Sequence, residues 1–280
     1  MKLLSVRHGD KEYVAELEGE TLHLLDAPSM LALIAAGGAM RTGATLPLEE
    51  VRILAPIPRP RRNILCVGKN YHAHAHEFTR SGFDSSASSA VDAIPEHPII
   101  FTKFPETVIA SGDPIPYPDG VSEALDYEAE IAVVIGKTCR RVSKADALAH
   151  VFGYTLVNDV TARDLQKLHK QWFIGKSLDG FCPMGPALVT ADSVAVEEID
   201  IECRVNGEQR QSAVSRDLIF DIPTLIETLS AGITLYPGDV IATGTPAGVG
   251  IGFDPPKYLK KGDVVEVSSS VIGLLTNNIN

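Results

Sequence analysis

The chain has 280 residues and a formal net charge of −11, and 45% of its residues are hydrophobic. This length suits one large domain, or a small domain beside a larger one, with a sizeable core. The charge argues against nucleic acid and anionic membranes as partners, because both require a basic surface. No stretch approaches the roughly 20 apolar residues of a membrane span. The four cysteines form no CxxC pair, and no signal peptide is evident, so we expect a reduced, cytoplasmic protein.

A small N-terminal domain is predicted over residues 1–58. The stretch "KEYVAELEGETLHLL" alternates around an EGE turn and predicts a β-hairpin. "SMLALIAAGGAM" predicts a short helix that ends at Gly37 and Gly38. "APIPRPRR", residues 55–62, is rich in proline and arginine, as expected of a stiff connector. We therefore expect a domain boundary there and a catalytic domain over residues 62–280.

The middle of the chain mixes short strands with short helices. "NILCVG" and "IIFTKF" predict strands, and "HAHAHEFTR" between them predicts a helix. Residues 81–98 are small and polar over a long stretch, which is typical of a lid or an insertion. A strand is expected over about 125–137, then a helix capped by Ser143, a strand over 154–157 and a helical turn in "TARDLQ".

The C-terminal part predicts short strands separated by NG, PGD and KGD turns. One helix, "FDIPTLIETLSAG", interrupts them, with Gly232 as a plausible cap. Helices do not alternate regularly with strands, which argues against a doubly wound parallel sheet. The expected fold class is therefore α+β and β-rich, with a mostly antiparallel sheet.

Three acidic residues follow or interrupt apolar strand-like stretches. In "DYEAEIAVVIG", Glu128 and Glu130 would point the same way on a strand, about 7 Å apart, and Asp126 shares their parity. Two such carboxylates are unfavourable unless a positive charge lies between them. Oxygen ligands favour Mg²⁺, Mn²⁺ or Ca²⁺, and Asp159, which closes another apolar strand, could complete such a site. In the alternative, these acids simply face water.

Four further polar residues are candidates for binding an anion. Arg163 and Gln166 would lie on successive turns of the "TARDLQ" helix. Lys176 stands in an apolar, glycine-rich stretch, where a lysine either reaches water or is held against an anion. "TGTPAGVG" lacks the Lys-Ser/Thr of a phosphate-binding loop, and its N–H groups with the Thr245 hydroxyl suit a carboxylate. Each residue taken alone is more often an ordinary surface residue.

Three histidines alternate in "HAHAHEFTR". On a strand, His72, His74 and His76 would line one face and could bind a transition metal. On a helix, which the alanines favour, they would spread over about 200°, too wide for one metal. His74 and Glu77 would then be neighbours on one face, in an arrangement that makes a general base for water. The alternative is a pair of ordinary polar residues at a helix start.

Taken in order, these motifs resemble the fumarylacetoacetate hydrolase family. The resemblance runs from Arg62 to the C-terminus and rests on "CVGKNYHAHAHE", "FTKFPETVI", "DYEAEIAVVIGK", "GYTLVNDVTARDLQ", "WFIGKSLDGFCPMGP", "RVNGEQRQ" and "TGTPAGVG". It implies a distorted β-sandwich or roll with a smaller N-terminal portion, in a homodimer. It also implies a set of site residues: Mg²⁺ or Mn²⁺ ligands at Glu128, Glu130 and Asp159, a water-activating pair of His74 and Glu77 on a lid helix, and substrate contacts at Lys176, Arg163, Gln166 and Thr245.

The expected activity is hydrolysis of a carbon–carbon bond in a 2,4-dioxo acid, which releases pyruvate and a carboxylic acid. Lys176 would act beside the cation to neutralise the pyruvate enolate that leaves. Decarboxylation of oxaloacetate, or hydration or isomerisation of a 2-oxo-enoate, is the alternative on the same residues. His74 and Glu77 favour hydrolysis, whereas a non-catalytic binding protein would lack this pair or the acidic triad. The expected partners are a small 2-oxo acid and a second copy of the chain, and neither nucleic acid nor a membrane.

Overall fold

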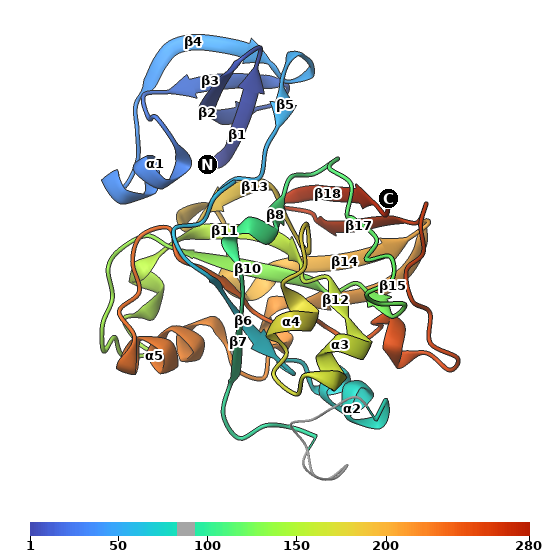
Figure 1. Ribbon diagram of the computed structural model, residues 1–280. Coiled ribbons are helices and arrows are strands. Elements are labelled where there is room, and N and C mark those ends of the chain that lie inside the picture. Colours follow the sequence, from blue (N-terminus) through green and yellow to red (C-terminus); the bar gives the residue numbers. More distant parts are fainter. Residues whose placement is uncertain (83–92) are drawn as a thin grey trace.

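The computed structural model describes residues 1–82 and 93–280, and one large, mostly antiparallel sheet crosses it (Figure 1). Across this sheet the strands are β4 (Arg41–Pro47), β3 (Thr21–Leu25), β2 (Lys11–Glu18), β1 (Lys2–His8), β13 (Cys182–Thr190), β11 (Val151–Asn158), β10 (Ala129–Ile135), β16 (Val240–Ala242), β6 (Ile64–Gly68) and β7 (Ile99–Lys103). β5 (Arg52–Ile53) pairs with β1, and β8 (Val108–Ile109) runs parallel to β13, as β16 does to β6.

A second sheet packs against the first. Its strands, in spatial order, are β15 (Glu208–Val214), β14 (Asp200–Val205), β17 (Val264–Ser269) and β18 (Gly273–Asn278). Ile131 and Leu156 of the main sheet share one buried cluster with Ile201 and Val267 of the second. A separate short pair joins β9 (Leu125–Asp126) to β12 (Thr161–Ala162). Two sheets whose inner faces bury one core confirm the β-rich α+β class.

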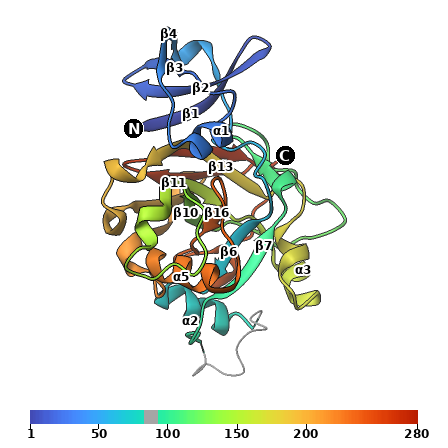
Figure 2. The ribbon, with the colours of Figure 1, turned by 90° about the vertical axis from the view of Figure 1, so that its left-hand side faces the viewer.

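Five short helices complete the architecture of the described residues: α1 (Met30–Ala36), α2 (His72–Arg80), α3 (Arg163–Leu168), α4 (Phe173–Lys176) and α5 (Ile222–Gly232). Figures 1 and 2 show α2 and α3 on the side of the molecule away from the N-terminal strands. The predicted hairpin, β2 and β3, and the predicted helices α1 and α2 are confirmed. Among residues 1–82 and 93–280, no helix is long and apolar enough to cross a membrane.

The main sheet includes the N-terminal strands. β1 pairs with β13 in the register Lys2 to Val189, so β1 to β4 extend the same sheet. Residues 54–63 form neither helix nor strand, as expected of the connector. A division into domains 1–58 and 62–280 stays a prediction. The lid or insertion predicted over 81–98 lies largely outside the described residues, since 83–92 are not among them.

Two predicted helical features differ from the structure. The helix expected after Ser143 is only a 3₁₀ turn at Ala147–His150. The Ser143 hydroxyl donates to the Asp146 side chain at 2.7 Å rather than accepting from a helical backbone N–H, and β11 begins at once after the turn. Gly232 is the last residue of α5 and not its cap, a position that Ile233 takes.

The strand expected over 125–137 is broken into β9 and β10. Asp126 causes the break, because its carboxylate accepts hydrogen bonds from the backbone N–H groups of Tyr127 at 2.9 Å and Gly250 at 2.7 Å. Such local bonds compete with strand pairing. Asp126 is not one of the three acids that converge, and its carboxylate binds Arg163, which also contacts Glu128.

Candidate active site

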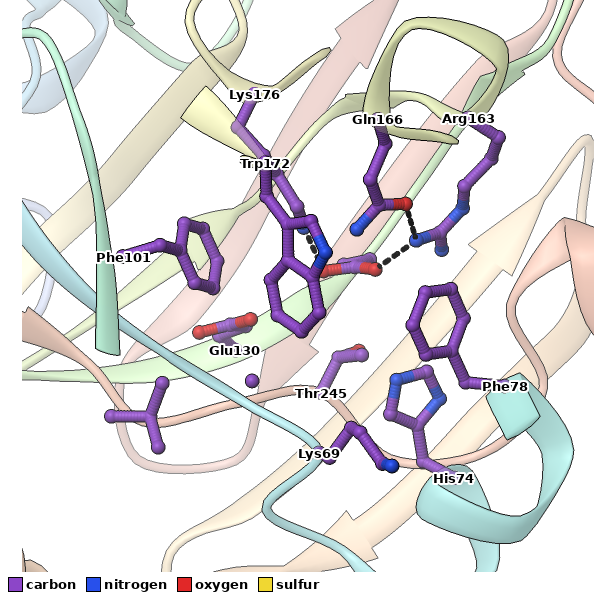
Figure 3. A pocket seen from close by; sticks show the side chains of 13 residues that line it. Lys69, His74, Phe78, Phe101, Glu130, Arg163, Gln166, Trp172, Lys176 and Thr245 are labelled. Atoms are coloured by element: carbon purple, nitrogen blue, oxygen red, sulfur yellow. Dashed lines mark hydrogen bonds and ion pairs between the residues drawn. The ribbon is translucent and has the colours of Figure 1, made fainter. Parts of the chain in front are cut away.

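Buried polar side chains from several elements surround one cavity (Figure 3). Its polar lining consists of Lys69, His74, Glu128, Glu130, Arg163, Gln166, Lys176 and Thr245. Two predicted site residues stand directly behind this lining. Asp159 contacts Lys176, and Glu77 contacts His74. All the predicted site residues thus come together, although they are spread over more than half of the chain.

The carboxylates of Glu128, Glu130 and Asp159 converge. One oxygen atom of each lies within 4.8 Å of the others, and all three residues are buried. The convergence follows from strand pairing, because β10 and β11 are antiparallel and Ala129 lies opposite Asn158. The Asp159 N–H donates to the Glu128 carbonyl at 2.8 Å, which fixes the third acid beside the first. The predicted convergence of three acids is confirmed.

Buried cations neutralise two of these acids. Lys176 Nζ lies 2.6 Å from Glu128 Oε2 and 2.8 Å from Asp159 Oδ2. Arg163 Nη1 lies 2.7 Å from Glu128 Oε1. Glu130 instead accepts a hydrogen bond from the Gly244 N–H at 2.8 Å. Within residues 1–82 and 93–280, no cation pairs with it.

The acids differ in pKa for this reason. Burial alone would raise the pKa of Glu128, but Lys176 and Arg163 outweigh burial and lower it to about 2. For Glu130, burial and the repulsion from Asp159 and Glu128 raise the pKa well above its usual value. One acid of the triad thus lacks a cationic partner within the part of the chain that the structure describes, and all the converging donors are oxygens. This set fits a hard divalent cation such as Mg²⁺ or Mn²⁺.

Lys103 is a member of the site that the sequence analysis missed. It is fully buried at the end of β7, and its Nζ lies 2.6 Å from Asp159 Oδ1. Asp159 is therefore held between Lys103 and Lys176. The signal was present in "IIFTKF", because Lys103 shares strand parity with Phe101, which lines the cavity.

The predicted pairing of His74 with Glu77 is present on α2. His74 Nδ1 lies 3.2 Å from Glu77 Oε2, and His74 lines the cavity (Figure 3). Glu77 also accepts from the Gly248 N–H at 3.0 Å. His72 and His76 are exposed and do not line the cavity. The helix therefore brings one histidine of the three into the site.

Arg163 is oriented by Asp126. Its Nε donates to Asp126 Oδ2 at 2.8 Å, and its Nη1 donates to Gln166 Oε1 at 3.2 Å. Its Nη2 is buried and has no hydrogen-bond partner among the described residues. The guanidinium thus keeps N–H groups for an anionic ligand.

The glycine-rich loop after β16 differs from its prediction. Its N–H groups were expected to suit a carboxylate, together with the Thr245 hydroxyl. Three of them donate instead to carboxylates of the chain itself, those of Gly244 to Glu130, Gly248 to Glu77 and Gly250 to Asp126. Of the loop groups expected to bind a ligand, the Thr245 side chain lines the cavity.

Lys69 and Trp172 are further lining residues that the sequence analysis did not single out. Lys69 is 3% exposed and has a left-handed backbone with φ of 55°, a conformation that is rare outside glycine and concentrated at functional sites. Trp172 packs edge-on against Phe78 and Phe101, with ring centroids 5.9 and 5.3 Å apart. A side chain at Gly68 would clash with this indole.

The part of the chain that carries the site matches a known protein family. Residues 63–280 match the model of the fumarylacetoacetate (FAA) hydrolase C-terminal domain. The chain belongs to the fumarylacetoacetate hydrolase family. Residues 1–56 match a second model, described as Rv2993c-like, N-terminal. The resemblance noted from the motifs is confirmed, and so is the family's β-rich fold.

Relatives within the fumarylacetoacetate hydrolase family carry several activity names. The chain is 57% identical over 233 residues to oxaloacetate tautomerase YisK of Bacillus subtilis. The aligned region covers 83% of this chain and 74% of that protein. It is 44% identical over 237 residues to the mitochondrial oxaloacetate tautomerase FAHD2A of Homo sapiens, covering 84% and 71%. Both relatives are thus named as tautomerases of oxaloacetate.

Solved structures of the family add two other names. The fumarylacetoacetate hydrolase EaFAH of Exiguobacterium antarcticum has a TM-score of 0.85 and 40% identity, covering 100% of this chain and 99% of that one. The 2-hydroxyhepta-2,4-diene-1,7-dioate isomerase of Mycobacterium marinum has a TM-score of 0.81 and 35% identity, covering 100% and 98%. This chain is therefore an enzyme of a superfamily whose members are named for tautomerisation, isomerisation and hydrolysis.

Proposed function

We propose that this enzyme interconverts the enol and keto forms of oxaloacetate, with Mg²⁺ or Mn²⁺ as its cofactor. The observation that carries the proposal is the meeting of an oriented histidine, His74, with buried acids and cations around one small cavity. The relatives at 57% and 44% identity, both named oxaloacetate tautomerases, support the choice of substrate.

Glu128, Glu130 and Asp159 would hold the cation, because their oxygens converge and Glu130 has no cationic partner among the described residues. When bound, the cation would polarise the 2-oxo group and so make the C3 protons of the substrate more acidic. Lys176 adds a fixed positive charge within 2.6 Å of Glu128. That charge stabilises negative charge as it develops on the 2-oxo oxygen.

His74 is the proposed base. Its Nδ1 faces Glu77 Oε2 at 3.2 Å, so Nδ1 carries the proton and Nε2 keeps a lone pair. Nε2 can therefore take a proton from C3 of the keto form and deliver it to the 2-oxo oxygen of the enolate, which gives the enol; the same transfer in reverse regenerates the keto form. Glu77 holds the ring in this orientation and stabilises the imidazolium that forms.

The substrate carboxylates find cationic and neutral donors in the lining. Arg163 has a buried Nη2 without a partner among the described residues, and the Thr245 hydroxyl faces the same cavity. Lys69 adds a further buried ammonium group to this lining. A dicarboxylic acid suits such a set, because each of its ends carries a charge that the lining can bind.

The size of the cavity favours a small substrate. Its volume is about 10 Å³, far below the roughly 300–1,000 Å³ of ligand pockets. The rings of Phe78, Phe101 and Trp172 form one wall. A closed apolar wall excludes water and strengthens the charge interactions inside the site. This supports a four-carbon acid over a substrate with a long acyl chain.

Hydrolysis of a 2,4-dioxo acid is the second candidate, and it is the reaction expected from the sequence. The His74–Glu77 pair favours it, because the same Nε2 could take a proton from water as that water attacks a carbonyl. The structure at 40% identity is named a fumarylacetoacetate hydrolase.

An assay panel with Mg²⁺ separates these candidates. We expect rapid loss of the enol absorbance of oxaloacetate without equivalent release of pyruvate. Acetylpyruvate, fumarylpyruvate and a sugar-derived 2,4-diketo-3-deoxy acid should release pyruvate much more slowly than oxaloacetate tautomerises. Faster pyruvate release from any of these acids would establish hydrolysis instead, and stoichiometric pyruvate from oxaloacetate would establish decarboxylation.

Replacing His74 with asparagine should lower turnover of oxaloacetate on the order of 10²-fold or more, because general base catalysis contributes typically 10²–10⁴-fold. Mg²⁺ affinity, measured by calorimetry, should stay unchanged, since His74 is not one of the converging acids. His72→Asn is the matched control, on an exposed position of the same helix. Full activity of the His74 variant would exclude this ring as the base.

The expected homodimer is also a proposal for this enzyme. Light scattering of the purified protein measures the mass of the assembly, and a mass equal to that of one chain would contradict it.

A further inference from the structure

Gln211 connects two parts of the site without lining the cavity. It is 1% exposed, on β15. Its Nε2 donates to Thr245 Oγ1 and to the Pro246 carbonyl, both at 2.7 Å. Its Oε1 accepts from the N–H of Ala129 at 3.1 Å. Ala129 lies between two of the converging acids, so one amide group braces the acidic strand β10 against the loop that carries Thr245.

The orientation of this amide follows from its backbone partners. The N–H of Ala129 can only donate, so it requires the oxygen of Gln211. The carbonyl of Pro246 can only accept, so it requires the NH₂ group. If the amide were flipped, its NH₂ group would face the Ala129 N–H, donor against donor, and its oxygen would face the Pro246 carbonyl, acceptor against acceptor. The NH₂ group therefore faces Thr245, and it can only donate.

This fixes the role of the Thr245 hydroxyl. Because Oγ1 accepts from Gln211 at 2.7 Å, its own proton points to a different partner. Among residues 1–82 and 93–280, no acceptor for this proton is present. Thr245 lines the cavity, where Figure 3 shows it between Glu130, Lys69 and His74. The hydroxyl is thus set to donate into the cavity.

We propose that Gln211 is a positioning residue that makes the Thr245 hydroxyl a hydrogen-bond donor to an anionic oxygen of the bound 2-oxo acid. The inference rests on the proposed function, because it requires a carboxylate or enolate oxygen in the cavity. Gln211 acts through Thr245, so its effect on ligand binding depends on that hydroxyl. A residue that only braced the fold would affect ligand binding whether or not the hydroxyl were present.

The test is a double-mutant cycle with Gln211→Glu and Thr245→Val. Glutamate keeps the length of the side chain but replaces the NH₂ donor with an acceptor, which draws the Thr245 proton away from the cavity. Oxalate is the probe, because its adjacent carboxylates imitate the carboxylate and enolate oxygens of a 2-oxo acid. Calorimetry at saturating Mg²⁺ gives its Kd, and oxaloacetate assays give kcat and KM.

We expect Gln211→Glu to raise the Kd of oxalate and the KM of oxaloacetate by about 10-fold, as for one hydrogen bond to a charged group, with a smaller change in kcat. In the Thr245→Val background, the same substitution should add little. Lower pH should partly restore oxalate binding by the Gln211→Glu variant relative to the unchanged protein, because a protonated carboxyl group can donate again.

If Gln211→Glu weakens oxalate binding equally with Thr245 and with Thr245→Val, the inference is overturned. A loss of Mg²⁺ affinity that accounts for the weaker oxalate binding would also overturn it. If Gln211→Glu does not fold, Gln211→Met replaces it in the same cycle. Thr245→Ser must then keep most of the oxalate affinity, since it keeps the hydroxyl. Oxalate binding needs no turnover, so a positive cycle with an enzyme inactive on oxaloacetate would contradict only the proposed function.

Discussion

Replacing Glu130 with glutamine should abolish Mg²⁺ binding and lower the turnover of oxaloacetate on the order of 10²-fold or more. Glu128 and Asp159 are already paired with buried cations, whereas Glu130 has none among the described residues. Its carboxyl group is therefore the one most available to a divalent cation, which would displace its proton on binding. Calorimetric titration with Mg²⁺ measures binding, and the enol absorbance of oxaloacetate measures turnover.

The variant is expected to fold. Glutamine is nearly the same shape as glutamate, and its amide oxygen can still accept the hydrogen bond from Gly244. Burial already raises the pKa of Glu130 and so favours its uncharged form. A neutral glutamine at this position should therefore change the free energy of unfolding little. Glu123→Gln is the control, because that carboxylate is exposed. Unchanged Mg²⁺ affinity in the Glu130 variant would contradict the proposed metal site.

Replacing Lys103 with methionine should lower the free energy of unfolding by about 3 kcal/mol, the lower end of the range for breaking a buried ion pair. Lys103 is fully buried, and Asp159 would keep Lys176 as its remaining partner. The loss should be smaller when Mg²⁺ is present, because a bound cation would again balance the charge of Asp159. Urea unfolding with and without Mg²⁺ measures both effects.

A second substitution makes this prediction sharper. Adding Asp159→Asn to Lys103→Met removes both partners, so the double variant should be more stable than the sum of the single losses implies. Lys137→Met, at an exposed lysine, is the control and should leave the free energy of unfolding nearly unchanged. Strictly additive losses would show that Lys103 acts by packing and not through the charge of Asp159.

The sequence was sufficient for the parts of the site that depend on local periodicity. Alternation along a strand placed Glu128 and Glu130 on one face, and the alanine-rich helix put His74 beside Glu77. The third acid, Asp159, could be proposed because it closes an apolar strand. Strand pairing in the structure brings it to the other acids. The same local rules also predicted α1, α2 and the N-terminal hairpin.

The parts that depend on contacts between distant residues could not be predicted in this way. The break before β10 arises because the loop at Gly250 donates to Asp126, a contact across more than a hundred residues of sequence. Lys103 and Gln211 likewise act through partners that are distant in the sequence, Asp159 and Thr245. Periodicity indicates which face such a residue occupies, but not which charge or hydroxyl it meets there.

The bond between Gly248 and Glu77 has a consequence for the reaction cycle. The proposed base His74 and its partner Glu77 lie on α2, whereas the acids and their cations belong to the sheet and to the segment around α3 and α4. Under the proposed mechanism, the reaction needs both parts. The Gly248 N–H joins them at 3.0 Å, so moving α2 outward would disconnect proton transfer from charge stabilisation in one step. Commitment to catalysis would then coincide with the docking of one helix onto one loop.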